Sequence, residues 1–205
     1  MPIRNREELE AAAREAGRLL QEINDCAGEP WFTDRAAKVR FPWRFLKPAE
    51  HHRQKLRFVA SPVLRSNLAY AVMTHDVLRW VVTRTTITGQ AEEMLIKEAI
   101  CLIGSMCESI TVFPGEHGLG RNNRTFVQRV GSLRERGVIG DELHDELCWV
   151  WEVRKREHLV DVPRAEWREY DTAHWNRATD AWKALRRALY LWRFPNANNP
   201  EDAPF

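Results

Sequence analysis

The sequence predicts an all-α protein, and three observations support this fold class. Hydrophobic residues recur at three- and four-residue spacing over several long segments, which is the period of one face of an α-helix. Residues that begin or end helices, chiefly Ser, Pro and Gly, stand between these segments. No convincing β-hairpin or internal repeat interrupts the pattern. We therefore expect a helical bundle with an additional N-terminal helix and a basic connector.

Residues 1–61 are expected to form that first helix and the connector. Between Glu7 and Ala27 the hydrophobic residues keep the helical period, and Gly28 then ends the helix. From Trp31 onward the period is lost, and basic residues greatly outnumber acidic ones. The connector's candidate nucleic-acid contacts are Arg40, Arg44, Arg53 and Lys55.

Aromatic residues are interleaved with the basic residues of this connector. Phe41, Trp43 and Phe45 alternate with cations, as in grooves that follow a nucleic-acid backbone and stack its bases. A solvated linker anchored by its aromatic side chains explains the same composition, and we prefer that interpretation.

Residues 62–192 are expected to form the main helical domain. Ser61 followed by Pro62 is typical of a helix start, and Gly137 closes a short helix that contains Phe126. Acidic residues follow Asp141, as the dipole of a helix beginning there favours. The longer expected helices span 62–85, 90–112, 141–156 and either 164–192 or 171–192, and 193–205 are expected to be a flexible tail.

The charge and the hydropathy of the chain exclude two classes of protein, polycations that bind nucleic acid indiscriminately and proteins that span a membrane. The 31 basic and 29 acidic residues give a net charge of only +2, so the chain is no indiscriminate polycation and any nucleic-acid binding must be local. The most apolar segment, residues 94–113, contains Lys97, Glu98 and Glu108, each of which costs about 2 to 4 kcal/mol at the centre of a bilayer. We expect a core helix there, and no membrane partner.

The cysteines and histidines indicate neither disulfides nor a metal centre. Four cysteines without a CxxC spacing, in a chain that opens without a signal-peptide pattern, suggest free thiols in the cytoplasm. His51 with His52, and His144 with its acidic neighbours, could bind a metal, but no third ligand has zinc-site spacing. We expect no metal and no cofactor.

Arg154 and His158 continue the apolar stripe of the helix that begins near Asp141. Leu147 and Val150 define this stripe, so both polar residues point toward the core or a partner helix. A buried charge requires a carboxylate, a polar cleft or a ligand. The pair is therefore a candidate site, with Glu108 as a candidate partner.

The segment from Leu147 to Leu159 resembles the helix that carries the Arg-x3-His motif of HEPN domains. Residues 107–110, with the sequence Cys-Glu-Ser-Ile, and residues 137–139, with the sequence Gly-Val-Ile, also resemble family features. The resemblance covers residues 62–192. A second pair, Arg168 and His174, satisfies the looser family spacing, but the first pair stands in the family's order.

The resemblance implies metal-independent RNA cleavage by a homodimer, in a toxin or an anti-phage effector. His158 would exchange a proton with the ribose 2′-OH or the leaving 5′ oxygen, and Arg154 would bind the scissile phosphate. Lys155 and Arg156 would hold flanking phosphates. An antitoxin or other regulatory protein is then an expected partner.

Two alternatives remain open from the sequence. Lys155 occupies a motif position where the family usually has Asn, Asp or His, which favours a non-catalytic binding module of the same fold. In that case Arg154 and His158 would be a structural pair tied to Glu108. The other alternative is a helical regulator whose basic connector binds nucleic acid.

Overall fold

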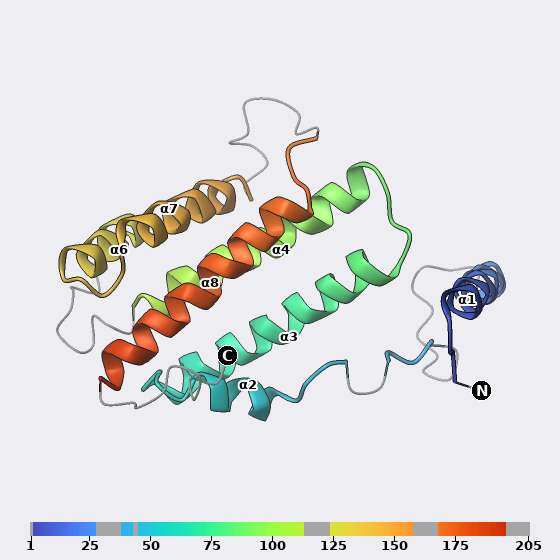
Figure 1. The fold of residues 1–205 in the computed structure, drawn as a ribbon, viewed down its shortest axis with the longest axis horizontal. Helices are drawn as coiled ribbons and strands as arrows, with labels where there is room; N and C mark the ends of the chain where they lie inside the picture. Colours follow the sequence, from blue (N-terminus) through green and yellow to red (C-terminus); the bar gives the residue numbers. More distant parts are fainter. Residues whose placement is uncertain (1, 28–37, 43–44, 113–123, 158–167, 196–205) are drawn as a thin grey trace. The chain divides into compact units, whose positions relative to one another are not determined.

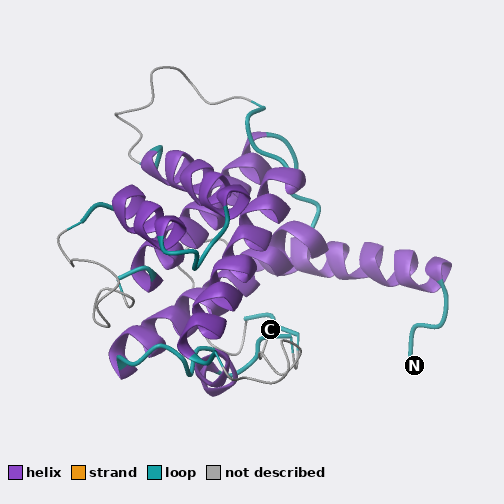
Figure 2. Ribbon diagram, turned by 60° about the vertical axis from the view of Figure 1, so that its left-hand side comes forward, coloured by secondary structure: helices purple, strands orange, loops and turns teal. Residues whose placement is uncertain are grey.

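The computed structural model describes residues 2–27, 38–42, 45–112, 124–157 and 168–195. Regular structure within these ranges is entirely α-helical (Figure 2), which confirms the predicted fold class. No helix among the described residues is long and apolar enough to cross a membrane. The helices are α1 (Arg6–Ala27), α2 (Ala49–Lys55), α3 (Pro62–Arg84), α4 (Gln90–Ile110), α6 (Phe126–Glu135), α7 (Asp141–Lys155) and α8 (Thr172–Arg193).

The chain divides into two compact units, residues 1–43 with α1 and residues 44–205 with the other helices. The division falls before the expected boundary at residue 61. Leu56, Phe58 and Val59 are at most 1% exposed and belong to the core of the second unit, and α2 packs against α3. The second half of the expected connector is therefore part of the helical unit.

Helix α4 is the central element of the helical unit. It packs against α3, α7 and α8, and Figure 1 shows α8 lying along it between α7 and α3. Ten of its residues are buried, including Ile100 and Ile103, which confirms the expected core helix. Its Lys97 is only 1% exposed, an unusual position for a lysine.

Local sequence explains where the helices begin and end. The Ser61 side chain accepts a hydrogen bond from the Leu64 amide at 3.3 Å, and Asp171 accepts one from the His174 amide at 2.9 Å. Thr125 forms a capping box at the start of α6, and Gly137, with φ of +69°, follows its end. The described helix α8 thus begins after Asp171, the later of the two predicted starts.

Candidate functional site

Arg154 lies in the last turn of α7, against Gly104 of α4. Leu147 and Val150 precede it on the buried side of α7, as the stripe predicts, and Val153 is buried as well. A Cβ atom added at Gly104 would lie 2.8 Å from the Arg154 Cβ. Only a residue without a side chain at position 104 lets α4 and α7 approach this closely, so Gly104 places the Arg154 side chain along α4.

Two carboxylates hold the Arg154 guanidinium at moderate distance. Glu108 Oε2 lies 3.5 Å from its Nε, and Glu157 Oε2 lies 3.5 Å from its Nη1. Both distances exceed the 2.7 to 2.9 Å typical of charge-assisted hydrogen bonds. The Nε atom is buried and has no hydrogen-bond partner among the residues that the structure describes. The guanidinium also lies 5.4 Å from the ring centre of Trp151, a cation–π contact.

The backbone around Glu108 is fixed by an arginine of α6. Arg129 donates from Nη2 to the Glu108 carbonyl oxygen at 3.2 Å and from Nε to Thr111 Oγ1 at 3.2 Å. Burial lowers the pKa of Arg129, and the charge of Glu108 partly opposes that shift. The C-terminal end of α4 is therefore tied to α6, and Glu108 has a defined position beside Arg154.

Lys155 and Arg156 extend away from the α4 contact. Lys155 Nζ pairs with Glu152 at 2.7 Å on the exposed side of α7. Arg156 Nη1 pairs with Glu169 at 2.8 Å and so joins the end of α7 to the segment before α8. Both cations therefore have carboxylate partners of their own, and their predicted role in binding flanking phosphates stays a prediction. His158, the predicted proton-transfer residue, lies outside the described residues.

The residues of the alternative pair, Arg168 and His174, have different contact partners. The Arg168 amide donates to Glu93 of α4 at 2.7 Å. His174 stacks on Trp149 with ring centres 6.0 Å apart, and its Nδ1 lies 2.8 Å from the capping carboxylate of Asp171. These contacts give the two residues different structural roles at the start of α8.

Cys101, a buried cysteine at the contact of α4 with α7, is not a nucleophile. Cys101 Sγ lies 3.8 Å from the Val153 carbonyl oxygen, between α4 and α7. Burial raises the pKa of this thiol to about 12, and the charges of Glu98 and Glu157 act in the same direction. The thiol is therefore protonated at neutral pH, and the thiolate chemistry of reactive cysteines is excluded here.

The predicted nucleic-acid contacts of the connector fall in both units. Arg40 is exposed in the first unit, and Arg44 lies outside the described residues. In the second unit, Arg53 pairs with Glu50 at 3.0 Å. Burial, then the charges of Lys55 and Lys47, lower the pKa of His51. The surface around α2 is thus locally basic.

No group of three His, Cys, Asp or Glu side chains within the described ranges could hold a metal ion. His52 instead faces Asp76 of α3, with 3.8 Å between Nε2 and Oδ2. His144 Nδ1 lies 2.9 Å from Asp145 Oδ1. Each of the two histidine groups therefore has a local carboxylate partner.

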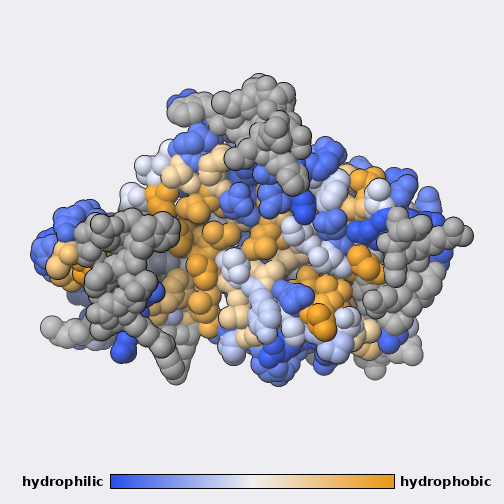
Figure 3. Space-filling model, turned by 180° about the vertical axis from the view of Figure 1, so that it is seen from behind, coloured by the Kyte–Doolittle hydropathy of each residue, from blue (hydrophilic) through white to orange (hydrophobic). Residues whose placement is uncertain are grey.

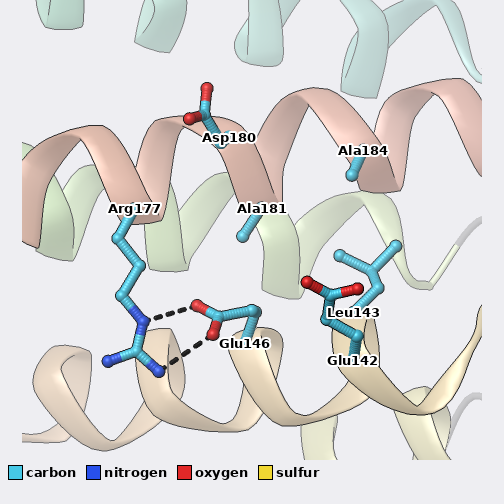
Figure 4. A pocket seen from close by; sticks show the side chains of 7 residues that line it. All are labelled: Glu142, Leu143, Glu146, Arg177, Asp180, Ala181 and Ala184. Carbon is cyan, nitrogen blue, oxygen red and sulfur yellow. Dashed lines mark hydrogen bonds and ion pairs between the residues drawn. The ribbon is translucent and has the colours of Figure 1, made fainter.

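A pocket of about 420 Å³ opens between α7 and α8, about two helical turns before Arg154. Figure 4 shows Arg177 reaching across it to Glu146, and the two bonds measure 2.6 and 3.0 Å. Arg177 also lies 4.0 Å from the ring centre of Trp149. Glu142 and Asp180 add negative charge to the lining. Because three carboxylates and one guanidinium line this pocket, and Glu146 already binds that guanidinium, the pocket does not suit a phosphate.

The sequence did not identify Gly104 or Glu157 as parts of the site. A glycine in the interior of a hydrophobic helix is a signal of close packing, although it does not name the packing partner. Glu157 stands three residues after Arg154, a spacing that brings helical side chains together.

Comparisons with protein-family models, with curated proteins and with solved structures found no match to this chain.

Proposed function

We propose that this chain is a metal-independent endoribonuclease of the HEPN type, with Arg154 and His158 as its catalytic pair. The observation that carries the proposal is the position of Arg154. A partly exposed guanidinium lies at the contact of α4 with α7, at the motif position of the resemblance, with carboxylates 3.5 Å away. Such a cation remains available to an anion that offers shorter bonds.

In the proposed reaction Arg154 binds the scissile phosphate. A phosphate can accept two parallel N–H bonds from the planar guanidinium, whereas Glu108 and Glu157 each face only one nitrogen. The negative charge on the phosphate oxygens increases in the transition state, so the guanidinium stabilises that state more than the bound substrate. Lys155 and Arg156 would bind neighbouring phosphates after exchanging their present carboxylate partners.

His158 would supply proton transfer. An imidazole with an ordinary pKa near 6.5 can take the proton of the 2′-OH, which then attacks phosphorus, and can give a proton to the leaving 5′ oxygen. The products are a 2′,3′-cyclic phosphate and a 5′-hydroxyl end. The attacking group exists only in RNA, so DNA is not a substrate.

A homodimer is part of the proposal because one site would require a base and an acid, which two copies of the motif supply. Hydrophobic side chains gather on one face of the helical unit (Figure 3). A second copy would cover apolar surface of this kind. We further propose a cytoplasmic toxin or anti-phage effector that an antitoxin or regulatory protein controls.

A non-catalytic binding module of the same fold is the second candidate. It is favoured by the two ion pairs of Arg154, which balance its charge without a ligand, and by Lys155 in the motif. The basic surface around α2 would fit the third candidate, a nucleic-acid-binding regulator that does not cleave.

The test is cleavage of a mixed RNA pool in EDTA by the wild type, by His158→Ala and by His174→Ala. We expect cyclic-phosphate ends with the wild type and with His174→Ala, and at least about a 100-fold loss with His158→Ala. All three proteins should have matching melting temperatures apart from the small effect of losing the His174 stack. Cleavage that survives in His158→Ala, or that no protein shows, would reject the ribonuclease.

A further inference from the structure

Helix α1 carries a hydrophobic seam with the spacing of a coiled coil. The seam positions alternate by three and four residues along nearly the whole helix, the heptad pattern with apolar a and d positions. Leu9, Leu19 and Ile23 on this seam are 42 to 54% exposed. The seam positions are Leu9, Ala12, Ala16, Leu19, Ile23 and Cys26.

The helix itself is well defined at its start and along its polar side. Asn5 accepts a hydrogen bond from the Glu8 amide at 2.8 Å, which caps the first turn. Arg6 pairs with Glu10 at 2.8 Å, and Arg18 pairs with both Glu15 and Glu22. Most of the stability of a helix in a protein comes from the packing of its apolar face, so an apolar partner along the seam would stabilise α1.

We infer that this seam pairs with α1 of a second copy in antiparallel orientation. Antiparallel helices place each a position opposite a d position of the partner. Leu9 then faces Cys26, Ala12 faces Ile23, and Ala16 faces Leu19, so a small side chain meets a larger one in every layer. The same three contacts repeat with the two helices exchanged, which gives a closed twofold interface.

Parallel pairing fits the same residues poorly. It places identical residues opposite each other, so the layers of Ala12 and Ala16 would be two successive gaps in the middle of the seam. It also places Leu20, at an e position, beside Glu15 of the partner. In the antiparallel pair Leu20 instead meets Ala13 of the other helix, and the apolar seam becomes one residue wider.

The acidic row formed by Glu8, Glu15 and Glu22 follows the opposite edge of the seam. In the antiparallel pair Glu15 approaches Glu22 of the second helix. Arg18 lies between these two glutamates on its own helix and pairs with both, so each copy brings a cation to the point where the rows meet. The same acidic row disfavours an anionic membrane surface as the occupant of the seam.

Disulfide trapping in the full-length protein tests the orientation directly. Cys26 of the wild type lies about 25 Å from Cys26 of an antiparallel partner, since the 17 residues between positions 9 and 26 rise 1.5 Å each. A Leu9→Cys variant brings the new thiol opposite Cys26, within the Cα separation of a disulfide. After mild oxidation we expect a linked dimer in Leu9→Cys, mapped by peptide mass spectrometry to residues 9 and 26, and none through Cys26 in the wild type.

Two further variants separate pairing from random collision. Leu20→Glu in the Leu9→Cys background should reduce the yield at least tenfold, because a carboxylate enters the apolar edge. Gln21→Glu in the same background adds the same charge on the outer face and should leave the yield unchanged. Any one of three results would overturn the inference. These are a dimer linked through Cys26 in the wild type, equal yields in the two double variants, and no linkage between residues 9 and 26 in concentrated Leu9→Cys protein.

Discussion

His75 of α3 and Arg154 of α7 both place a polar group at a contact between helices, but the two groups differ in burial and in the length of their contacts. Trp175 Nε1 donates to His75 Nε2 at 2.8 Å, and both residues are at most 8% exposed. Burial lowers the pKa of His75 to about 4, so the ring is neutral at pH 7. The Arg154 side chain is 23% exposed, and its carboxylate partners lie at 3.5 Å.

The difference separates a structural contact from a candidate ligand site. The bond between His75 and Trp175 is short, neutral and closed to water, so we expect its loss to lower the stability of the fold. The contacts of Arg154 are longer, charged and partly open to solvent, so a ligand can replace them at little cost to the fold. Changes at the two places should therefore affect different measurements.

The largest effect is expected from Arg154→Gln, which keeps the aliphatic stem beside Gly104 and removes the charge. Under the proposed function RNA cleavage should fall about 100- to 1000-fold, because the developing phosphate charge loses its cation. The free energy of unfolding should change by less than about 1 kcal/mol, because the ion pairs are partly exposed. Single-turnover cleavage and urea unfolding measure the two quantities. A large loss of stability with unchanged cleavage would make Arg154 structural, like His75.

The second-largest effect is expected from lowering the pH, because the buried His75 resists protonation in the folded protein. The pKa of His75 is about 4 in the folded protein and about 6.5 in the unfolded chain. Between these two pH values the histidine is protonated in the unfolded chain and neutral in the folded protein. Keeping His75 neutral costs the folded protein nothing above pH 6.5. As the pH falls from 6.5 to 4, the free energy of unfolding should decrease by about 3 kcal/mol. Urea unfolding at a series of pH values measures this loss.

His75→Gln is the matched control, because its amide oxygen can still accept the Trp175 bond and does not titrate. Its stability should fall less steeply between pH 6.5 and pH 4. Part of the slope should remain, since burial also lowers the pKa of His52. Identical pH profiles for the wild type and the variant would show that His75 is not responsible.

A smaller effect is expected from Gly104→Ala. The added methyl group would lie 2.8 Å from the Arg154 Cβ and 3.0 Å from its Cγ, so α4 and α7 must separate slightly. We expect a loss of about 1 to 3 kcal/mol in stability, together with weaker cleavage. Gly131→Ala in α6 is the control: its Cβ meets nothing within 4 Å, so it should stabilise the helix by about 0.5 to 1 kcal/mol. Equal effects of the two changes in thermal unfolding would contradict the close contact.

The smallest effect is expected from Glu146→Gln, which breaks the paired bonds to Arg177 at the mouth of the pocket. Both side chains are partly exposed, so stability should fall by no more than about 1 kcal/mol and cleavage should stay unchanged. A large effect on cleavage would move the functional site from Arg154 to this pocket.

The sequence predicted the long helices closely because their hydrophobic period and their end signals agree. The expected spans 62–85 and 90–112 compare with Pro62–Arg84 and Gln90–Ile110. Helix α2 was not predicted, because its seven residues are mostly polar and lack an apolar period. Its burial depends on His52 and on the hydrophobic residues that follow it, so only the tertiary structure identifies it as part of the bundle.

Part of the candidate site was predictable, because the hydrophobic period of α7 indicates which of its residues face the core. The stripe of α7 indicated the direction of Arg154, and the need of a buried charge for a carboxylate suggested Glu108, which the structure places beside it. The role of Gly104 depends on the approach of two helices, and no local pattern specifies that approach. The burial of Lys97 was likewise hidden, because lysine in an amphipathic helix normally indicates the solvent side.

The central position of α4 has a consequence for synthesis of the protein. Helix α8, which lies along α4, begins about sixty residues after α4 ends. At about 5 to 20 residues per second, a ribosome needs several seconds to deliver it. During that interval α4, the most apolar of the described helices, lacks at least one of the three helices that cover it, so part of its apolar surface stays uncovered until α8 emerges.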